Sequence, residues 1–297
     1  MRLRLLFSPF LALSLAAGTQ AACPTRPWSS LFVFGDSYSD TGAGYVDGNG
    51  PTAVAYLARD LGIPFTYYGA PDMAGKSLNF AVSAARTGSE PGQEQADRTG
   101  RYHGYLGRGM KLQVAQFAAG VKDQSIHFDP DTTLFFLAGG LNDEMGKSRE
   151  TLDNIEGEIA TIYQLGGRNF LIARLPEAIP QFPTIGKYLN PALARIPQEL
   201  KQSLPDAHVA LSGWGSYYDA VITHPAKYGI TNVKDKCAGR ALLNEPEIPC
   251  ASPATHFFYH DGHPSTAVHR IVGDMLAREA RGMFRQARCN PEKGKRK

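Results

Sequence analysis

The sequence is poor in features that mark metal-binding, membrane-spanning or modular proteins. It has only four cysteines in 297 residues, and their spacing fits no zinc site. After residue 22, no apolar run is long enough to span a bilayer. Neither an internal repeat nor a linker-like stretch divides the chain, so we expect a single domain.

The sequence also lacks a strong excess of charge of either sign. The formal net charge is +3, and much of that excess lies in the basic tail at 293–297. A short basic tail is usually solvated, so the charge does not indicate nucleic-acid binding. With 43% hydrophobic and 20% charged residues, the composition is that of a globular protein with one large core.

The N-terminus has the pattern of a secretory signal peptide. Two arginines precede an apolar run over 5–17 that is too short to span a bilayer, and the small residues Ala21 and Ala22 follow it. Gln20 stands where a lipoprotein signal has an aliphatic residue, so acylation of Cys23 is the weaker alternative. We therefore expect a signal peptide over 1–22, a domain over 23–290, a disordered basic tail over 291–297, and a secreted or periplasmic location.

The even number of cysteines predicts two disulfides in an oxidising compartment. Of the three possible pairings, we favour Cys237 with Cys250, which closes a short proline-containing loop. The other pair is then Cys23 with Cys289, which joins the two ends of the mature chain. Both bonds are expected to be structural and not reactive.

Strand-like and helix-like segments alternate along the chain. Strands are predicted over 31–34, 77–82, 132–138, 169–175 and 207–211, and helices over 51–61, 112–121, 152–165, 191–203, 214–223 and 264–284. The polar segment 90–109 is predicted to be a surface loop, and 225–258 an irregular excursion. The alternation predicts an α/β fold, a three-layer α/β/α sandwich with a mainly parallel sheet.

Polar residues follow three of the predicted strands where each strand ends. These clusters are Gly35-Asp36-Ser37, Asn79 with Ser83-Ala84, and Gly140-Leu141-Asn142-Asp143, and a fourth, His260-Asp261-Gly262-His263, precedes the last helix. Each cluster alone also fits an ordinary turn or helix cap. Together they offer a nucleophile, a base and hydrogen-bond donors beyond the strand ends, where open α/β sheets bind ligands. The set therefore predicts a serine hydrolase site.

These segments resemble the motif blocks of the GDSL or SGNH family of serine hydrolases, and within it the secreted lipase, phospholipase and cholinesterase-like branch. The matching stretches are Phe34–Gly42, with Tyr38 where leucine is usual, then Asn79–Ala85, Gly140–Asp143 and His263–Ser265. The resemblance implies a flavodoxin-like SGNH hydrolase fold, with Ser37 as the nucleophile and His263 as the general base. It also implies an oxyanion hole made by the Asn142 amide and the backbone N–H groups of Ser37 and Ala84.

The sequence departs from the family pattern in two places. Ala84 stands where the family has glycine, which is tolerable because the donor there is a backbone N–H. His260 stands where the family has an aspartate three residues before the catalytic histidine. If the stretch is extended, the Asp261 side chain reaches His263, and if it is helical, His260 does. The expected third member is therefore, in order, Asp261, then a backbone carbonyl or bound anion, then His260.

The family resemblance implies hydrolysis of carboxylic esters through an acyl-enzyme, without a cofactor. Expected substrates are lipid or lysophospholipid esters, or small acyl esters such as choline esters. A carbohydrate O-acetylesterase, or a catalytically impaired scaffold that acts as a binding protein, is the alternative. The expected partners are thus small-molecule or lipid esters, with at most transient contact with a membrane surface. No nucleic acid is expected, and the protein is expected to be a monomer. No metal is expected, because Pro264 directly follows the cluster of His256, His260, Asp261 and His263 and no helix precedes it, so these side chains are not expected to share one helix face.

Overall fold

The structure is a computed structural model that describes residues 28–96 and 103–288. Its centre is a six-stranded sheet in the order β2-β3-β1-β6-β7-β8, and every neighbouring pair runs parallel. The strands are β1 (Ser30–Gly35), β2 (Phe65–Tyr67), β3 (Ser77–Asn79), β6 (Thr133–Ala138), β7 (Asn169–Ala173) and β8 (His208–Ser212). Because β1 lies in the middle of the sheet, its C-terminal end opens onto the crevice where such sheets bind ligands.

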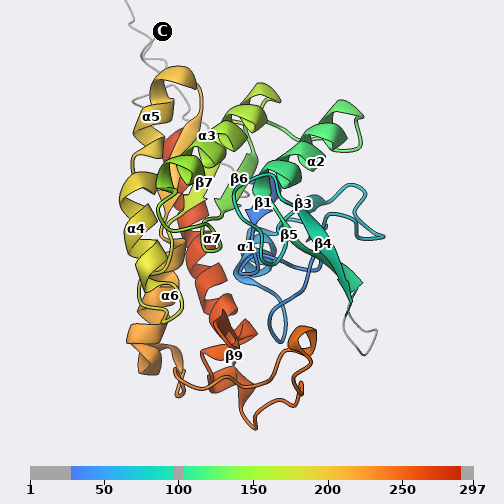
Figure 1. Ribbon diagram of the computed structural model, residues 1–297. Helices are drawn as coiled ribbons and strands as arrows, with labels where there is room; N and C mark the ends of the chain where they lie inside the picture. Colours follow the sequence, from blue (N-terminus) through green and yellow to red (C-terminus); the bar gives the residue numbers. More distant parts are fainter. Residues whose placement is uncertain (1–27, 97–102, 289–297) are drawn as a thin grey trace, which may run out of the picture.

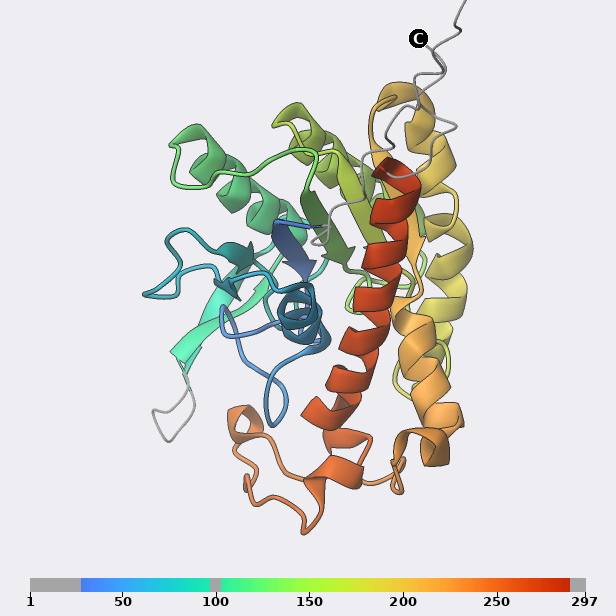
Figure 2. The same ribbon diagram turned by 180° about the vertical axis from the view of Figure 1, so that it is seen from behind.

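Helices cover both faces of this sheet. The helices are α1 (Ala53–Leu61), α2 (Met110–Lys122), α3 (Ser148–Gln164), α4 (Pro183–Leu193), α5 (Ile196–Ser203), α6 (Trp214–Thr223) and α7 (Thr266–Arg288). Helices α2 and α3 lie in front of the sheet in Figure 1, whereas α7 crosses in front of it in the reverse view of Figure 2, packed against α1 and α6. The predicted three-layer α/β/α sandwich with a parallel sheet is confirmed.

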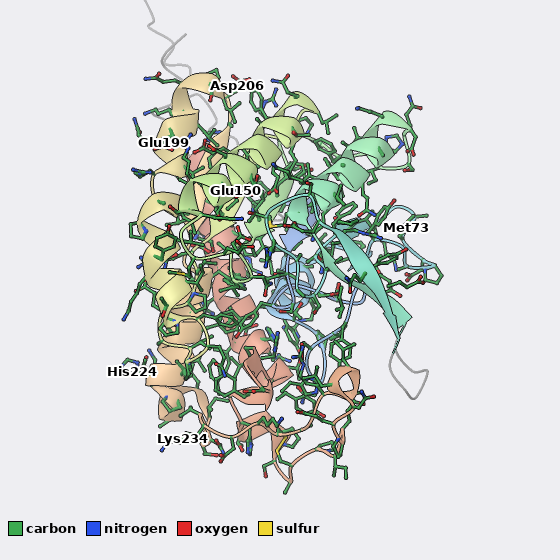
Figure 3. The ribbon with its side chains drawn as sticks, viewed as in Figure 1. Met73, Glu150, Glu199, Asp206, His224 and Lys234 are labelled. Carbon is green, nitrogen blue, oxygen red and sulfur yellow. A yellow bond between two sulfur atoms is a disulfide. The ribbon has the colours of Figure 1, made fainter. Side chains whose placement is uncertain are left out.

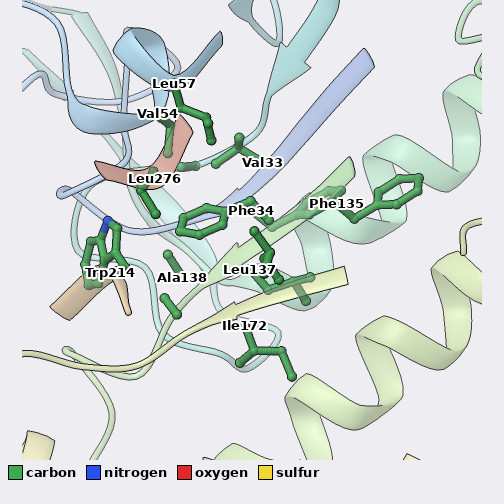
Figure 4. Close-up of a cluster of buried hydrophobic side chains, with 14 of the residues drawn as sticks. Val33, Phe34, Val54, Leu57, Phe135, Leu137, Ala138, Ile172, Trp214 and Leu276 are labelled. Carbon is green, nitrogen blue, oxygen red and sulfur yellow. The ribbon is translucent and has the colours of Figure 1, made fainter. Parts of the chain in front are cut away.

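The apolar run that forms β1 is buried on both sides. Phe32 and Phe34 contact Phe117 of α2, with ring centroids 5.0 and 5.8 Å apart. On the opposite side of the strand, Val33 lies close to Val54 and Leu57 of α1 (Figure 4). This two-sided burial explains why the strand reads as a continuous apolar run without alternation.

Segments outside the sheet form two small ribbons and an irregular excursion. Strands β4 (Pro91–Ala96) and β5 (His103–Arg108) form an antiparallel ribbon that projects from the body of the molecule (Figure 1). Strands β9 (Phe258–His260) and β10 (His263–Pro264) form a second one. Between α6 and β9 lie the short 3₁₀ helices η1 (Pro225–Tyr228), η2 (Ala241–Leu243) and η3 (Pro253–Thr255). The excursion predicted over 225–258 is therefore confirmed.

Two predicted elements differ from the structure. The segment 90–109 was predicted as a loop because it is polar and rich in glycine, yet most of it pairs as the β4–β5 ribbon. The helix predicted over 191–203 is two helices, α4 and α5, and Pro191 lies inside α4 instead of at a helix start. Pro183 and Pro197 take the helix-start positions that proline favours.

The disulfide predicted between Cys237 and Cys250 is present, and it closes part of the excursion that leads to β9. The predicted Cys23–Cys289 bond, the signal peptide and the basic tail lie outside the described residues. Among residues 28–96 and 103–288, none of the helices combines the length and apolar character that crossing a bilayer requires. Charged side chains such as Glu199, Asp206 and Lys234 are exposed and lie at the periphery of the molecule (Figure 3).

Candidate active site

Strand β1 ends in a tight turn that presents Ser37. Gly35 is required at the end of the strand because a Cβ atom there would lie 2.6 Å from the carbonyl oxygen of Ala138. The next residue, Asp36, is fully buried, and its carboxyl oxygen accepts the backbone N–H of Tyr38 at 3.1 Å. The turn is therefore fixed from the interior, and Ser37 is left partly exposed at the end of the central strand.

His263 is carried by the small ribbon of β9 and β10 near the other end of the chain. The two strands pair with His260 opposite His263, on either side of a two-residue turn, Asp261–Gly262. Gly262 has a φ of +72°, a conformation that glycine adopts without steric cost. The hydroxyl of Tyr38 donates to the carbonyl of Gly262 at 2.6 Å, so the residue after Ser37 is bonded to the turn that precedes His263.

The hydroxyl of Ser37 and the imidazole of His263 are in direct contact. Ser37 Oγ lies 2.8 Å from His263 Nε2, although the two residues are 226 positions apart. The other ring nitrogen, Nδ1, lies 3.0 Å from the main-chain carbonyl oxygen of Asp261. Since a carbonyl only accepts, Nδ1 carries the proton of the neutral ring, and Nε2 accepts the Ser37 hydroxyl. This is the tautomer that a general base for Ser37 needs.

The environment of His263 keeps the imidazole neutral. Burial lowers the pKa of this imidazole, and it outweighs the nearby Asp47 carboxylate and the Asp261 carbonyl, which raise it. Arg240 and His260 act in the same direction as burial. The ring is therefore ready to accept a proton at neutral pH.

The structure corrects the expectation for the third member of the site. The Asp261 side chain is exposed, and its carboxylate accepts a hydrogen bond of 3.4 Å from the amide of Gln181 instead of facing His263. The His260 ring is also bonded elsewhere. The reason is that the stretch is neither helical nor extended: it is a hairpin turn, which leaves the Asp261 carbonyl as the partner of His263 Nδ1. This is the backbone-carbonyl alternative.

Asp47 is a residue of the site that the sequence reasoning missed. Its carboxylate is completely buried and accepts a hydrogen bond of 2.8 Å from Nδ1 of His260. The other oxygen accepts a bond from Arg240 and lies 3.5 Å from Nε2 of His263. Asp47 belongs to no motif block, and the replacement of an expected aspartate by His260 was the only indirect signal that a carboxylate had to come from elsewhere.

Three donors that could bind an oxyanion come from separate strand ends. Ala84 has a φ of +63°, so it adopts the left-handed backbone for which the family uses glycine. In the part of the chain that the structure describes, the N–H groups of Ser37 and Ala84 have no acceptor. The amide of Asn142 donates one hydrogen to the carbonyl of Ala85 at 2.9 Å, which leaves its second hydrogen for a ligand.

Asp40 ties the Ser37 turn to the segment that carries Ala84. One carboxylate oxygen accepts the N–H groups of Gly42 and Gly44, and the other accepts the N–H of Ser83 at 2.8 Å. Burial raises the pKa of Asp40 to about 6, against the opposing effect of these bonds, and raises that of Asp36 to about 7. Both side chains bond within the turns, and among the described residues neither forms a hydrogen bond or ion pair with His263, which agrees with a supporting role.

The histidines of the C-terminal cluster have separate partners. His256 lies against the carbonyl of Ser252 at 2.9 Å and near Cys250, whereas His260 and His263 face Asp47. Within residues 28–96 and 103–288, no group of three or more ligand-type side chains converges as a metal site would require.

An open cleft of about 380 Å³ adjoins Ala84. Its walls come from the segment after Ala84 and from the β4–β5 ribbon, and they mix apolar with polar and charged groups: Ala84, Arg86, Glu90, Pro91, Gly92, Gln93, Leu106 and Gly107. A second cavity of about 370 Å³ is lined by Ser29, Ser30 and Phe32 among others. Its lining residues on and just before β1 lie about 10 to 20 Å before the end of that strand, at about 3.3 Å per residue.

Several proteins resemble this chain in sequence. A GDSL esterase/lipase of Arabidopsis thaliana is 27% identical over 159 residues, 45% of this chain and 44% of that protein. Another from the same plant is 24% identical over 315 residues, 82% of this chain and 80% of that protein. The thermolabile hemolysin of Vibrio parahaemolyticus is 25% identical over 195 residues, 57% of this chain and 46% of that protein. The chain thus spans less than half the length of the first of these relatives.

Solved structures resemble the chain more distantly. A member of the lipolytic G-D-S-L family from Veillonella parvula has a TM-score of 0.44 and 12% identity, covering 84% of this chain and 97% of that one. The acetylxylan esterase Axe2 from Geobacillus stearothermophilus has a TM-score of 0.42 and 15% identity, covering 86% of this chain and 96% of that one. The model of the GDSL-like lipase/acylhydrolase family matches residues 31–276, most of the sequence. The chain therefore belongs to the GDSL-like lipase/acylhydrolase family.

Proposed function

We propose that the protein is an exported serine hydrolase that cleaves carboxylic esters through an acyl-enzyme intermediate. The observation that carries this proposal is the 2.8 Å contact between Ser37 Oγ and His263 Nε2. In the proposed reaction, Ser37 attacks the ester carbonyl, His263 takes its proton, and the Asp261 carbonyl holds the imidazole in the correct tautomer. The N–H groups of Ser37 and Ala84 and the amide of Asn142 then stabilise the negatively charged oxygen.

The same contact favours catalysis over the alternative of a binding protein on an impaired scaffold. A scaffold that has lost its activity has no need to keep a hydroxyl, a correctly protonated imidazole and two unoccupied N–H donors at converging strand ends. The Cys237–Cys250 disulfide supports export to an oxidising compartment.

The cleft beside Ala84 favours small acyl esters among the expected substrates. It is open and its walls include Arg86, Glu90 and Gln93, whereas a long acyl chain needs a continuous apolar channel. The cavity at the start of β1 has neither Ser37 nor Ala84 among its lining residues, so it does not adjoin the proposed nucleophile. Small esters, including choline esters and sugar O-acetyl groups, therefore rank above lipid and lysophospholipid esters.

Hydrolysis of p-nitrophenyl acetate and butyrate by the wild type and the Ser37→Ala variant tests the proposed activity. We expect turnover that depends on Ser37, and equal rates in the two proteins would favour the binding-protein alternative. A series of p-nitrophenyl esters of increasing chain length then tests the substrate class. The cleft predicts the highest kcat/KM for acetate to butyrate, and a maximum at long chains would instead support a lipid ester.

A further inference from the structure

Asp47 places a buried negative charge beside the nitrogen of His263 that exchanges protons with Ser37. Its Oδ2 atom lies 3.5 Å from His263 Nε2, and its side chain is fully inaccessible to solvent. In the resting state, Nε2 accepts the Ser37 hydroxyl and has no proton to give to Asp47. Once Nε2 is protonated, the two groups become an ion pair shielded from water.

The neighbours of Asp47 hold the carboxylate in this place and keep it ionised. Nδ1 of His260 donates to Oδ1 at 2.8 Å, and Arg240 donates to Oδ2. Burial by itself would raise the pKa of Asp47, but the His260 hydrogen bond, the Arg240 charge and, once the ring is protonated, His263 lower it. His260, which occupies the position of the family's aspartate, thus bonds to the carboxylate instead of to His263.

Catalysis at this site needs a negative charge near His263 to stabilise the protonated ring. In a serine triad, a carboxylate at Nδ1 stabilises the imidazolium that forms when the serine loses its proton. Here the partner of Nδ1 is the neutral carbonyl of Asp261, which fixes the tautomer but carries no full charge. Because burial disfavours the charged ring, a dyad without a nearby anion would form the imidazolium at a high cost.

We propose that Asp47 stabilises the protonated His263 during ester hydrolysis, supplying from the Nε2 side the negative charge that a triad carboxylate supplies at Nδ1. The inference rests on the ester-hydrolase function proposed above. Asp47 acts through His263 and is a positioning residue, and His260 and Arg240 position Asp47 in turn.

The proton balance of the reaction leaves Asp47 ionised throughout. When Ser37 Oγ bonds to the ester carbon, its proton passes to Nε2 and the carbonyl electron pair moves onto the oxygen. Asp47 then faces an imidazolium. Collapse of the tetrahedral intermediate re-forms the carbonyl, breaks the bond to the alcohol oxygen, and returns the proton from Nε2 to that oxygen. Water repeats the same two steps on the acyl-enzyme and releases the acid.

Several groups besides Asp47 act on the pKa of His263. The Asp261 carbonyl from the hairpin turn raises it, whereas Arg240 from the excursion and His260 from β9 lower it. The neighbouring Tyr38 ring, 5.6 Å away between centroids, is neutral, and a buried His269 on α7 is neutral because burial lowers its pKa to about 3. Asp47 is therefore the one full negative charge among these groups.

The test combines the Asp47→Asn variant with two readouts. The first is the pH profile of kcat/KM for p-nitrophenyl acetate, and the second is the titration of the His263 ring followed by NMR, with resonances assigned from a His263→Gln variant. We expect kcat/KM to fall on the order of 10- to 100-fold. This loss is smaller than the roughly 10⁴-fold cost of a missing triad carboxylate, because the Asp261 carbonyl still holds the tautomer. The acid limb of the kcat/KM profile, where activity falls at low pH, and the midpoint of the His263 titration by NMR should both move to lower pH.

The Arg240→Gln variant should shift the two pH midpoints in the opposite direction. It therefore keeps the proposal testable if Asp47→Asn does not fold. Without Arg240, the Asp47 charge is less neutralised, so the acid limb and the NMR midpoint should move to higher pH. Asp60→Asn is the matched control, because it removes another carboxylate that pairs with an arginine, Arg59, at the C-terminal end of α1. Its pH profile should match that of the wild type.

The possible outcomes separate this inference from the proposed function. Suppose that the wild type hydrolyses esters through Ser37, but Asp47→Asn leaves the acid limb and the NMR midpoint in place or raises them. The role of Asp47 is then overturned, while the proposed function stands. If Arg240→Gln moves the profile to lower pH, the role is also overturned. If no hydrolysis depends on Ser37, the proposed function fails, even when the NMR midpoint reports the Asp47–His263 interaction.

Discussion

The hydrogen bond from Tyr38 to the Gly262 carbonyl offers a sharp test of how the two halves of the site are held together. Tyr38 is fully buried, and the bond length is 2.6 Å. In the Tyr38→Phe variant, the ring keeps its packing against Trp214 and His263, with centroids 5.6 Å away in each case. Only the hydroxyl donor is lost, so the effect reports the bond and not a cavity.

The magnitude follows from the burial of both partners. A buried carbonyl that loses its donor costs about 1–3 kcal/mol of unfolding free energy. The turn that carries His263 also loses its tether to the residue after Ser37. Since displacement of a catalytic group by 1 Å can cost on the order of 100-fold, a shift of a few tenths of an ångström should lower kcat by about tenfold. KM should change little, because Tyr38 lies inside the protein and does not line the cleft.

Urea denaturation and steady-state kinetics with p-nitrophenyl acetate measure the two effects. Tyr218→Phe is the matched control, because it removes another buried hydroxyl contact, 2.8 Å from Nδ1 of His269. It should lower stability by a similar amount and kcat by less than twofold. A wild-type kcat in Tyr38→Phe, or an equal loss of kcat in Tyr218→Phe, would show that the bond from Tyr38 to Gly262 does not position His263 for catalysis. Tyr38→Leu, which restores the usual family residue, should be at least as damaging because it also leaves a cavity.

Three further predictions concern pH, backbone strain and the disulfide. Because burial lowers the pKa of His263 and the base must be neutral, kcat/KM should rise with pH through a midpoint below 6.5 and stay high at neutral pH; a midpoint above 6.5 in the kinetic profile would contradict this. Ala84→Gly should raise the free energy of unfolding by about 1 kcal/mol in urea denaturation, because alanine pays to hold a φ of +63°; destabilisation would show that the strain is absent. Replacing Cys237 and Cys250 by alanine should lower that free energy by about 3 kcal/mol, since the bond spans 13 positions; an unchanged denaturation midpoint would argue against a structural role.

The parts of the fold that sequence reasoning predicted are those set by local patterns. The apolar run of β1 and the Gly35 turn after it are both contained within a few residues, and so are the strand ends near Asn79 and Asn142. Parallel strands bring their carboxyl ends to one edge of the sheet, so the residues at these strand ends also predicted where the active site lies. The β4–β5 ribbon was missed because its residues are polar and show no alternating apolar side chains.

The sequence could not rank the backbone carbonyl first as the third group of the site, because distant contacts determine which group faces His263. The hairpin at His260–His263 is held by the Tyr38 hydroxyl, 224 positions before Gly262. The His260 ring is drawn to Asp47, 213 positions before it. A local reading offered helical or extended geometry, each with a side chain as the partner of His263, and therefore placed a backbone carbonyl only second. The hairpin assigns that partner to the backbone and leaves the negative charge to a loop residue outside every motif.

Covalent labelling by a fluorophosphonate tests whether His263 activates Ser37, because this reagent reacts with serines that a neighbouring base activates. Activation of Ser37 by His263 predicts a single adduct, mapped by mass spectrometry to the peptide that contains Ser37, absent in Ser37→Ala and strongly slowed in His263→Ala. An adduct on another residue, or labelling of Ser37 at the wild-type rate in His263→Ala, would contradict the claim that these two side chains act together.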